Sequence, residues 1–347
     1  MPRSLCLAAA FLVGAISLAV ARPSPGKGPI HGLVTMGSLR YVLNPTLEPE
    51  DRLAEANAHP GLYAGAVLAA TWDQLEPQPN RFDFSTLDQA LARVRAYNAA
   101  HPQTPLVAKL RIFAGLHSPD WVKQLDGGPV SLSRGAKSAT FPHFWSVPYR
   151  SAWRNLQRVL AARYDTNPLV AEVAVSSCAS VTAEPFVVAL SPGNRPAMLK
   201  AGYTEAAMQA CLLGAIDDYA VWRHTAIDFT FSPFRRIIDG HIGTSAAFTS
   251  TVMEKFRAQY GARGVIANHG LQPRPLPQAV PIYEAIKRLG PPIEFQTLKP
   301  REDWDAAFAT ARAIGMTELE IWNTQASGGI ADVTTAQLQS WRQQLEP

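Results

Sequence analysis

Side chains able to do chemistry stand at or just past the ends of several short apolar runs in this sequence. They are Trp72, His117, Glu184, Asn268, His269, Glu294, Gln296 and Trp322. Carboxyl groups and imidazoles can exchange protons or attack an electrophilic carbon, and indole rings offer flat apolar faces. The positions matter because the reactive side chains of a parallel barrel come from the C-terminal strand ends and the loops after them.

The elements that must position these side chains alternate as strand and helix along the chain. Short runs rich in Val, Ile and Phe predict strands. They are Gly32–Met36, Gly65–Ala70, Leu106–Phe113, Val170–Ser176, Ile227–Phe231, Gly264–Asn268, Ile293–Thr297 and Thr317–Trp322. Amphipathic segments predict helices at Leu87–Tyr97, Ser151–Tyr164, Thr204–Trp222, Ser245–Tyr260, Trp304–Ile314 and Thr334–Leu345.

Eight such repeats favour one closed (β/α)8 barrel, the TIM-barrel fold, over residues 22–347. The competing fold is an open doubly wound sheet, which usually binds its cofactor through a Gly-rich first turn. The sequence has no G-x-G-x-x-G or Walker loop, so the barrel is preferred. Residues 124–148 are interpreted as a long loop insertion after the third strand, on the face where barrel active sites form.

The N-terminus has the pattern of a cleavable secretion signal. Arg3 supplies a positive charge, Leu5 to Val20 form an apolar run, and Ala19-Val20-Ala21 is a small-residue cleavage site. The run is short for a membrane span. Residues 1–21 are therefore predicted to be a signal peptide, cut after Ala21. The mature protein is predicted to be secreted or periplasmic, with no membrane partner.

Composition argues against several other classes of function. The net charge is only +4 and there is no run of Lys or Arg, so no nucleic-acid partner is expected. No C-x-x-C, H-E-x-x-H or EF-hand pattern occurs, so neither a metal nor another cofactor is predicted. Beyond the signal, Cys178 and Cys211 could pair or remain buried thiols. The oligomeric state cannot be derived from the sequence.

Three short motifs resemble those of known enzymes. The first is Thr71-Trp72-Asp73-Gln74-Leu75-Glu76-Pro77, followed by Asn80-Arg81-Phe82-Asp83-Phe84-Ser85-Thr86-Leu87-Asp88. The others are Gly115-Leu116-His117-Ser118-Pro119-Asp120-Trp121 and Ala183-Glu184-Pro185. Together they resemble (β/α)8 glycoside hydrolases of the β-galactosidase, xylanase and cellulase type, which are clan A-like enzymes. The resemblance implies hydrolysis of O-glycosidic bonds in an oligo- or polysaccharide, and a carbohydrate substrate as the partner.

The resemblance also implies two catalytic carboxyl groups. In such enzymes the acid/base follows strand four and the nucleophile lies near the end of strand seven, which here gives Glu184 and Glu294 and a retaining mechanism. Glu184 would need a raised pKa to be protonated as the acid. Ala183 replaces the Asn that commonly precedes the acid/base, so a contact with the sugar 2-hydroxyl must come from elsewhere.

Glu294 has competitors for the nucleophile's place. It is about the third residue of its strand, whereas Gln296 shares its parity and lies nearer the rim. If Gln296 occupies that place, double displacement fails, because an amide cannot form the glycosyl intermediate. Glu320 is a rival carboxylate. Arg111 shares its parity with Lys109 and Phe113, so one of these two cations is predicted to enter the barrel or its rim. A buried Arg needs a carboxylate partner, and Glu294 or Glu320 could serve.

Aromatic and polar strand-end residues are candidates for sugar binding. Trp322 resembles the Trp under the −1 sugar in this superfamily, while Trp72, His117 and the Asn268-His269 pair could line the site or be structural. Trp145 in the insertion could form an outer subsite. The alternative function is a non-catalytic carbohydrate-binding barrel that has lost a carboxylate. Ala183 and Gln296 support this alternative, because they differ from the residues that the catalytic mechanism would need at those places. A barrel enzyme of another class has no supporting motif.

Overall fold

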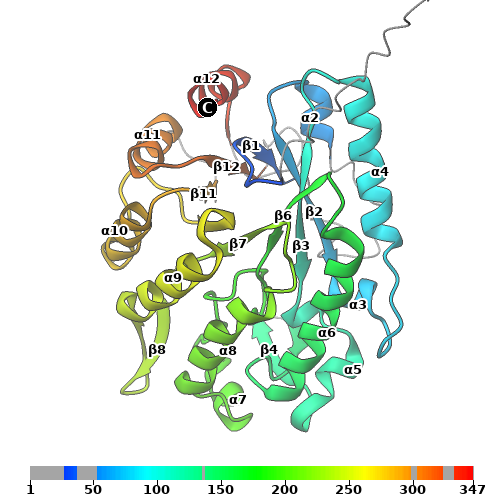
Figure 1. Ribbon diagram of the computed structural model, residues 1–347. Helices are drawn as coiled ribbons and strands as arrows, with labels where there is room; N and C mark the ends of the chain where they lie inside the picture. The colour runs from blue at the N-terminus through cyan, green and yellow to red at the C-terminus, as the bar shows by residue number, and fades with distance from the viewer. Residues whose placement is uncertain (1–26, 37–52, 135–136, 298–302, 323–331, 347) are drawn as a thin grey trace, which may run out of the picture.

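The computed structural model describes residues 27–36, 53–134, 137–297, 303–322 and 332–346. Eight parallel strands close into a barrel in which each strand pairs with the next along the chain and the last pairs with the first (Figure 1). The strands are β1 (Gly32–Thr35), β2 (Gly65–Thr71), β3 (Val107–Phe113), β6 (Val170–Ala174), β7 (Ala226–Thr230), β10 (Gly264–Asn268), β11 (Ile293–Gln296) and β12 (Glu318–Ile321). The predicted (β/α)8 barrel is confirmed.

Helices cover the outside of the barrel (Figure 1). The longer ones are α4 (Ser85–Ala100), α6 (Val147–Tyr164), α8 (Glu205–Asp218), α9 (Ala246–Tyr260), α10 (Val280–Leu289), α11 (Trp304–Ile314) and α12 (Thr335–Leu345). Shorter ones are α2 (Ala54–Ala58), α3 (Trp72–Leu75), α5 (Asp120–Lys123) and α7 (Arg195–Lys200). Among the described residues, no helix is long and apolar enough to cross a membrane.

The sequence explains where these elements begin. The strands are buried along almost their whole length, as expected when helices cover one face and the barrel interior fills the other. Side-chain oxygens of Ser146, Thr204 and Ser245 accept backbone hydrogen bonds at the starts of α6, α8 and α9. Such caps satisfy amide groups that the first helical turn leaves without a partner.

The predicted strands agree with the observed ones to within two residues at each end. The insertion after the third strand differs from the expected loop, because it contains a hairpin of β4 (Val130–Arg134) and β5 (Lys137–Phe141). A second hairpin, β8 (Phe234–Ile238) with β9 (His241–Ser245), was not predicted. Its turn holds Asp239-Gly240, both with positive φ, which is a strong hairpin signature.

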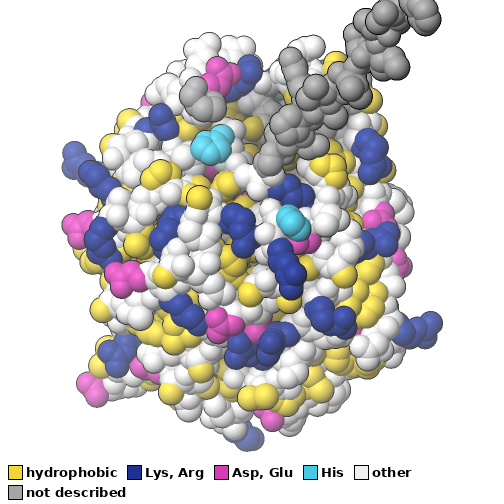
Figure 2. All heavy atoms as spheres, in the orientation of Figure 1, with side chains coloured by type: hydrophobic (Ala, Val, Ile, Leu, Met, Phe, Trp, Pro, Cys, Tyr) yellow, Lys and Arg dark blue, Asp and Glu magenta, His cyan; other side chains and the backbone are white. Residues whose placement is uncertain are grey.

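The insertions gather at one end of the barrel. Segments β4, α5, α7 and β8 follow the C-terminal ends of β3, β6 and β7, and they lie together at the lower end of Figure 1. The outer surface is mixed in character. Figure 2 shows Lys and Arg side chains scattered over the viewed face among acidic, apolar and other residues.

Candidate active site

The segment that carries Glu184 follows β6 and is held by neighbouring elements. The Ser176 hydroxyl donates to the carbonyl of Ile112 in β3. The Tyr149 hydroxyl from α6 donates to the Ser177 carbonyl at 2.5 Å. These bonds explain how Glu184, well beyond the end of its strand, can occupy a fixed position at the barrel mouth.

Gly115 allows the closest approach to this segment. Its φ is +58°, a value that L side chains rarely adopt, and a Cβ there would lie 2.2 Å from the carbonyl oxygen of Ser180. The same carbonyl accepts a hydrogen bond from the amide of Leu116 at 3.0 Å. The motif Gly115-Leu116-His117 therefore supports the Glu184 segment through its backbone.

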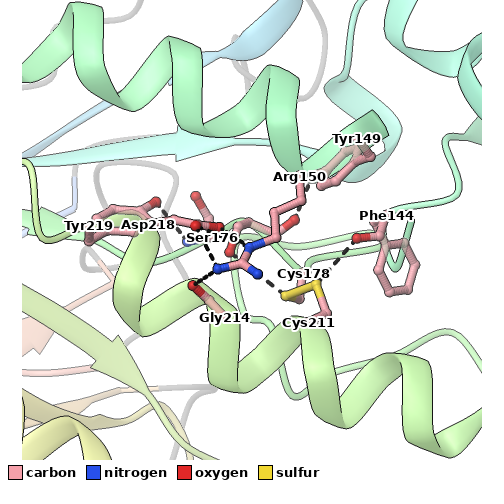
Figure 3. Close-up of a disulfide and its surroundings, with 10 residues drawn as sticks. Phe144, Tyr149, Arg150, Ser176, Cys178, Cys211, Gly214, Asp218 and Tyr219 are labelled. Atoms are coloured by element: carbon pink, nitrogen blue, oxygen red, sulfur yellow. Dashed lines mark hydrogen bonds and ion pairs between the residues drawn. A yellow bond between two sulfur atoms is a disulfide. The ribbon is translucent and has the colours of Figure 1, made fainter. Parts of the chain in front are cut away.

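A disulfide also fixes the segment that carries Glu184. Cys178 and Cys211 are bonded, which joins the segment after β6 to helix α8 (Figure 3). Figure 3 also shows the adjacent ion pair of Arg150 and Asp218, with 2.9 Å between Nη2 and Oδ1. Of the two alternatives that the sequence left open, the structure shows the paired cysteines.

Glu184 keeps 20% of its side chain exposed, so solvent reaches it. Its Oε1 lies 2.6 Å from Nδ1 of His269, and its Oε2 accepts a hydrogen bond of 3.0 Å from the Thr182 hydroxyl. Burial acts to raise the pKa of Glu184, but the hydrogen bond and charge of His269 outweigh it and lower that pKa. This direction is opposite to the raised pKa expected of an acid.

His269 follows β10 and contacts two further strands. Its Nε2 lies 3.1 Å from the hydroxyl of Thr230 in β7 and 3.5 Å from Oε2 of Glu294 in β11. Burial lowers the pKa of His269, but the charge of Glu294 and the hydrogen bond with Glu184 raise it to about 10. The imidazole is therefore charged at neutral pH, and it is a partner of carboxylates rather than a free sugar contact.

Glu294 lies below this histidine and has 0% exposure. Neither Oε1 nor Oε2 makes a hydrogen bond, and the contact of Oε2 with His269 is an ion pair at 3.5 Å. Burial raises the pKa of Glu294, and the charges of Lys109 and His269 counteract only part of that shift. Gln296 is also buried, and its amide donates to Oε1 of Glu320 at 2.6 Å. Neither residue of β11 therefore presents a free functional group to solvent in this structure.

Arg111 has the carboxylate partner that its parity requires. Its two terminal nitrogens donate to Glu320 at 2.6 and 2.7 Å, a bidentate pair. Burial would raise the pKa of Glu320, but the charges of Arg111 and Lys109 lower it overall. Glu320 is thus committed to Arg111, which leaves it poorly suited to the catalytic role considered for it.

A cluster of charged side chains fills the barrel further from the mouth. Lys109 lies 2.6 Å from Glu318, 2.8 Å from Asp228 and 3.1 Å from Glu172. We call these four residues the Lys109 cluster. Sequence parity indicated that Lys109 could enter the barrel, but its three partners were missed. Glu318 lies two residues before Glu320 in β12, so the two side chains point to the same side of the strand. This spacing was the sequence signal that could have identified Glu318 as a partner of Lys109.

For two strand-end residues, Trp72 and Asn268, the structure favours the structural alternative over a place in the site wall. Trp72 is fully buried, and its indole nitrogen donates to Glu76 at 2.9 Å, so it belongs to the core rather than to a site wall. Glu76 also accepts a hydrogen bond from the backbone amide of Asn80, so its role is structural. The side chain of Asn268 donates to the carbonyl of Phe231 at 2.9 Å, which makes it structural too.

The remaining aromatic candidates are partly exposed. Trp322 directly follows β12, and its amide donates to Thr297. His117 packs edge-on against Phe113, and its pKa is lowered by burial. Trp145 stacks on His143 with 5.3 Å between ring centroids. Trp322, His117 and Trp145 keep surface that a sugar could contact, so their binding roles remain predictions.

One group of described side chains has spacing that could suit a metal ion. Ligand atoms of His269, Glu294 and Glu320 lie within 4.8 Å of one another. Arg111 and Gln296 already donate to Glu320, and Lys109 lies 3.6 Å from it. A metal ion would have to compete with these resident cations, so we assign none.

Comparison with protein families supports the same class of enzyme. A glycoside hydrolase family 42 model, described as beta-galactosidase, matches residues 55–207. The match covers less than half of the chain, and it includes Glu184 but not Glu294. It confirms the predicted resemblance to barrel glycoside hydrolases, and glycoside hydrolase as the class of enzyme. No curated protein shows a significant sequence match.

Solved structures share the fold at low sequence identity. The catalytic domain of beta-amylase from Paenibacillus polymyxa is 10% identical, with a TM-score of 0.59, over 91% of this chain and 99% of that chain. Endo-glycoceramidase II from Rhodococcus sp. is 14% identical, with a TM-score of 0.52, over 91% of this chain and 78% of that chain. These likenesses show a shared barrel fold.

Proposed function

We propose that this protein is a secreted enzyme that hydrolyses O-glycosidic bonds in an oligo- or polysaccharide, with Glu184 as the acid/base. The observation that carries the proposal is the position of Glu184. It is a partly exposed carboxyl group at the C-terminal end of the barrel, inside the segment that matches a glycoside hydrolase family. Barrel enzymes place their catalytic groups at this end.

Glu294 is the proposed nucleophile, which makes the reaction retaining. Glu184 and Glu294 contact opposite nitrogens of one imidazole, so two carboxyl groups belong to the same site. Two such groups are what glycosidic hydrolysis needs, one for proton transfer and one for attack on the anomeric carbon. Because Glu294 has no exposed surface here, the proposal requires the ring of His269 to turn away from Glu294 when a sugar enters, while Nδ1 keeps its contact with Glu184.

Secretion rests on two features of the chain. The first is the signal pattern at residues 1–21, which lies outside the described residues. The second is the bond between Cys178 and Cys211, since disulfides form and persist in oxidising compartments. The expected cut after Ala21 can be checked by N-terminal sequencing of protein recovered from culture medium or periplasm.

Turnover of aryl glycosides by the wild type and by Glu184→Gln and Glu294→Gln variants tests the proposal. We expect each variant to lose at least about 10²-fold in kcat/KM, the scale of proton transfer by a positioned carboxyl group. Glu284→Gln is the matched control, because Glu284 is exposed on α10. Unchanged rates in both variants would overturn the proposal.

The burial of Glu294 supports one alternative, a carbohydrate-binding barrel without turnover. In that case calorimetry would show that the protein binds oligosaccharides, and no aryl glycoside would be cleaved. Glu184→Gln would then change affinity alone. The proposed hydrolase instead predicts turnover in the wild type and retained sugar binding in the Glu184→Gln variant.

A further inference from the structure

His269 lies between the two carboxyl groups of the proposed mechanism. Its Nδ1 is 2.6 Å from Oε1 of Glu184, and its Nε2 is 3.5 Å from Oε2 of Glu294. Because the two nitrogens lie on different sides of the ring, the imidazole separates the carboxyl groups. The hydroxyl of Thr230, 3.1 Å from Nε2, fixes the orientation of the ring.

The surroundings of this ring carry more negative than positive charge. Besides Glu184 and Glu294, the charged groups around it and its partners are Glu320 on β12, Asp228 on β7, and Lys109 and Arg111 on β3. Lys109 and Arg111 are themselves paired with carboxylates. A buried imidazole among such groups is stabilised when it carries a proton on both nitrogens.

A charged His269 leaves Glu184 ionised in the same pair. An ionised carboxylate has no proton to give to a leaving oxygen, yet the first step of glycosidic hydrolysis needs a proton donor. Among the described residues, the nearest proton to Glu184 on a group that titrates is the one on Nδ1 of His269. The Thr182 hydroxyl also donates to Glu184 but does not give up its proton in this pH range.

We propose that His269 is a positioning residue that stores the proton delivered by Glu184 and that holds the two carboxyl groups in place until a sugar enters. This inference rests on the proposed function. In the first step the Nδ1–H bond breaks, its electron pair stays on Nδ1, and an O–H bond forms at Oε1 of Glu184. Glu184 then passes this proton to the leaving-group oxygen as the glycosidic C–O bond breaks and Glu294 bonds to the anomeric carbon.

The second half of the reaction returns the proton. Water attacks the anomeric carbon, the bond to Glu294 breaks, and the water proton moves to Glu184. That proton then returns to Nδ1 of His269, so the site ends as it began, with no other reactant than water. A histidine suits this role because its proton affinity changes readily with its surroundings.

The protonation state of His269 can be measured without any substrate. Nitrogen NMR of protein labelled at its histidines reports whether both ring nitrogens carry protons, and the resonance lost in a His269→Asn variant provides the assignment. We expect a doubly protonated ring at neutral pH and a lower pKa in both Glu184→Gln and Glu294→Gln. His224→Asn is the control, because His224 is exposed at the other end of β7. A neutral His269 in the wild type would overturn the proposal.

The loss of rate in a His269 variant should depend on the leaving group if His269 stores a proton, but not if it only packs in the site. Phenyl glycosides need a proton on the departing oxygen, whereas dinitrophenyl glycosides depart without one. We expect His269→Asn to lose about 10²-fold or more on phenyl glycosides but only a few-fold on dinitrophenyl glycosides. Equal losses on both substrates would show a structural role and overturn the proton-store assignment.

The two measurements distinguish failure of this inference from failure of the proposed function. If glycosides are hydrolysed but His269 is neutral, or leaving-group dependence is unchanged in His269→Asn, only the inference fails. If no glycoside is hydrolysed, the proposed function fails and the proton store fails with it. A doubly protonated ring would then still establish the bridge between Glu184 and Glu294.

Discussion

The Lys109 cluster and the Glu184–His269–Glu294 bridge both pair carboxylates with cations, but they differ in access to solvent. The side chains of Lys109 and its partners Glu172, Asp228 and Glu318 have no exposed surface. Glu184 at the mouth keeps 20% of its side chain exposed. The first group therefore holds its charges in a closed interior, while the second can exchange protons with a substrate or with water.

The cations of the two regions also differ in chemistry. Lysine and arginine hold their protons tightly at neutral pH. Burial alone would lower the pKa of Lys109, but the charges of Asp228, Glu172 and Glu318 outweigh burial and raise that pKa further. The ordinary pKa of a histidine is about 6.5, and that of His269 reaches about 10 only because of Glu294 and Glu184, so His269 can give up its proton once one of these partners loses its charge. The comparison indicates that fixed charge stabilises the barrel interior, whereas titratable charge is placed at the mouth where chemistry is expected.

Removing the central cation of the closed region should have the largest effect on stability. Lys109→Met leaves Glu172, Asp228 and Glu318 without their shared partner, and breaking a buried pair costs about 3–5 kcal/mol. Urea denaturation measures the free energy of unfolding. The loss should shrink at low pH as Glu172 and Glu318, whose pKa values are raised by burial, become protonated. Lys200→Met on the exposed part of α7 is the control. A loss of stability no greater than that of the control would contradict the role of Lys109.

Removing the disulfide should weaken the support of the mouth. Replacing both Cys178 and Cys211 with Ser should cost about 2–4 kcal/mol, because their sequence separation is 33 residues and the bond restricts the unfolded chain. Thermal unfolding with and without a reductant measures the change. The wild type should lose stability on reduction, while the double variant should not respond. If the reductant changed the thermal stability of the wild type and of the double variant equally, the disulfide would not contribute to stability.

Filling the space at Gly115 should displace the Glu184 segment. Gly115→Ala places a Cβ 2.2 Å from the Ser180 carbonyl oxygen, so the backbone must shift. We expect a loss of about 1–3 kcal/mol, the usual range for overpacking, together with reduced kcat. Gly202→Ala is the control, because Gly202 also has a positive φ but nothing within 4 Å of a new Cβ. Equal kcat in both variants would contradict the positioning role of Gly115.

A separate effect concerns pH. The folded-state pKa of His269 is about 10, above its usual 6.5, so its stabilising contribution is complete below about 6.5 and is lost as pH rises through about 10. One pKa unit corresponds to about 1.4 kcal/mol, so the change over this whole range should be about 5 kcal/mol at most. Denaturation midpoints over this pH range should fall in the wild type and stay flatter in His269→Asn. If the midpoints of the wild type and of His269→Asn changed with pH in parallel, the positive charge assigned to His269 would be contradicted.

Much of the fold could be predicted because it depends on local patterns. The eight apolar runs are buried strands, and their spacing fixed the topology. The partner of Arg111 could be narrowed to Glu294 or Glu320 from parity along strands, and Glu320 is the observed one. The hairpin β8–β9 was missed, although Asp239-Gly240 marks its turn.

The site was harder to predict, because its key contacts join segments distant in sequence. Sequence spacing placed Glu184 and His269 at the same end of the barrel, but only the folded loops bring their atoms within 2.6 Å. Burial of Trp72 and Asn268 likewise depends on neighbours from other elements. The depth of Glu294 follows from strand register, which a run of four residues does not determine.

Azide rescue of an aryl glycoside reaction tests most directly whether Glu184 and Glu294 share the work of a retaining hydrolase. Glu184→Ala with azide should form a glycosyl azide that keeps the substrate's anomeric configuration, because azide replaces water in the second step. Glu294→Ala with azide should form the azide of inverted configuration. Product NMR distinguishes the two. Wild-type cleavage with no azide product from either variant would contradict the two-glutamate account, and sugar binding with no cleavage at all would identify a carbohydrate-binding barrel.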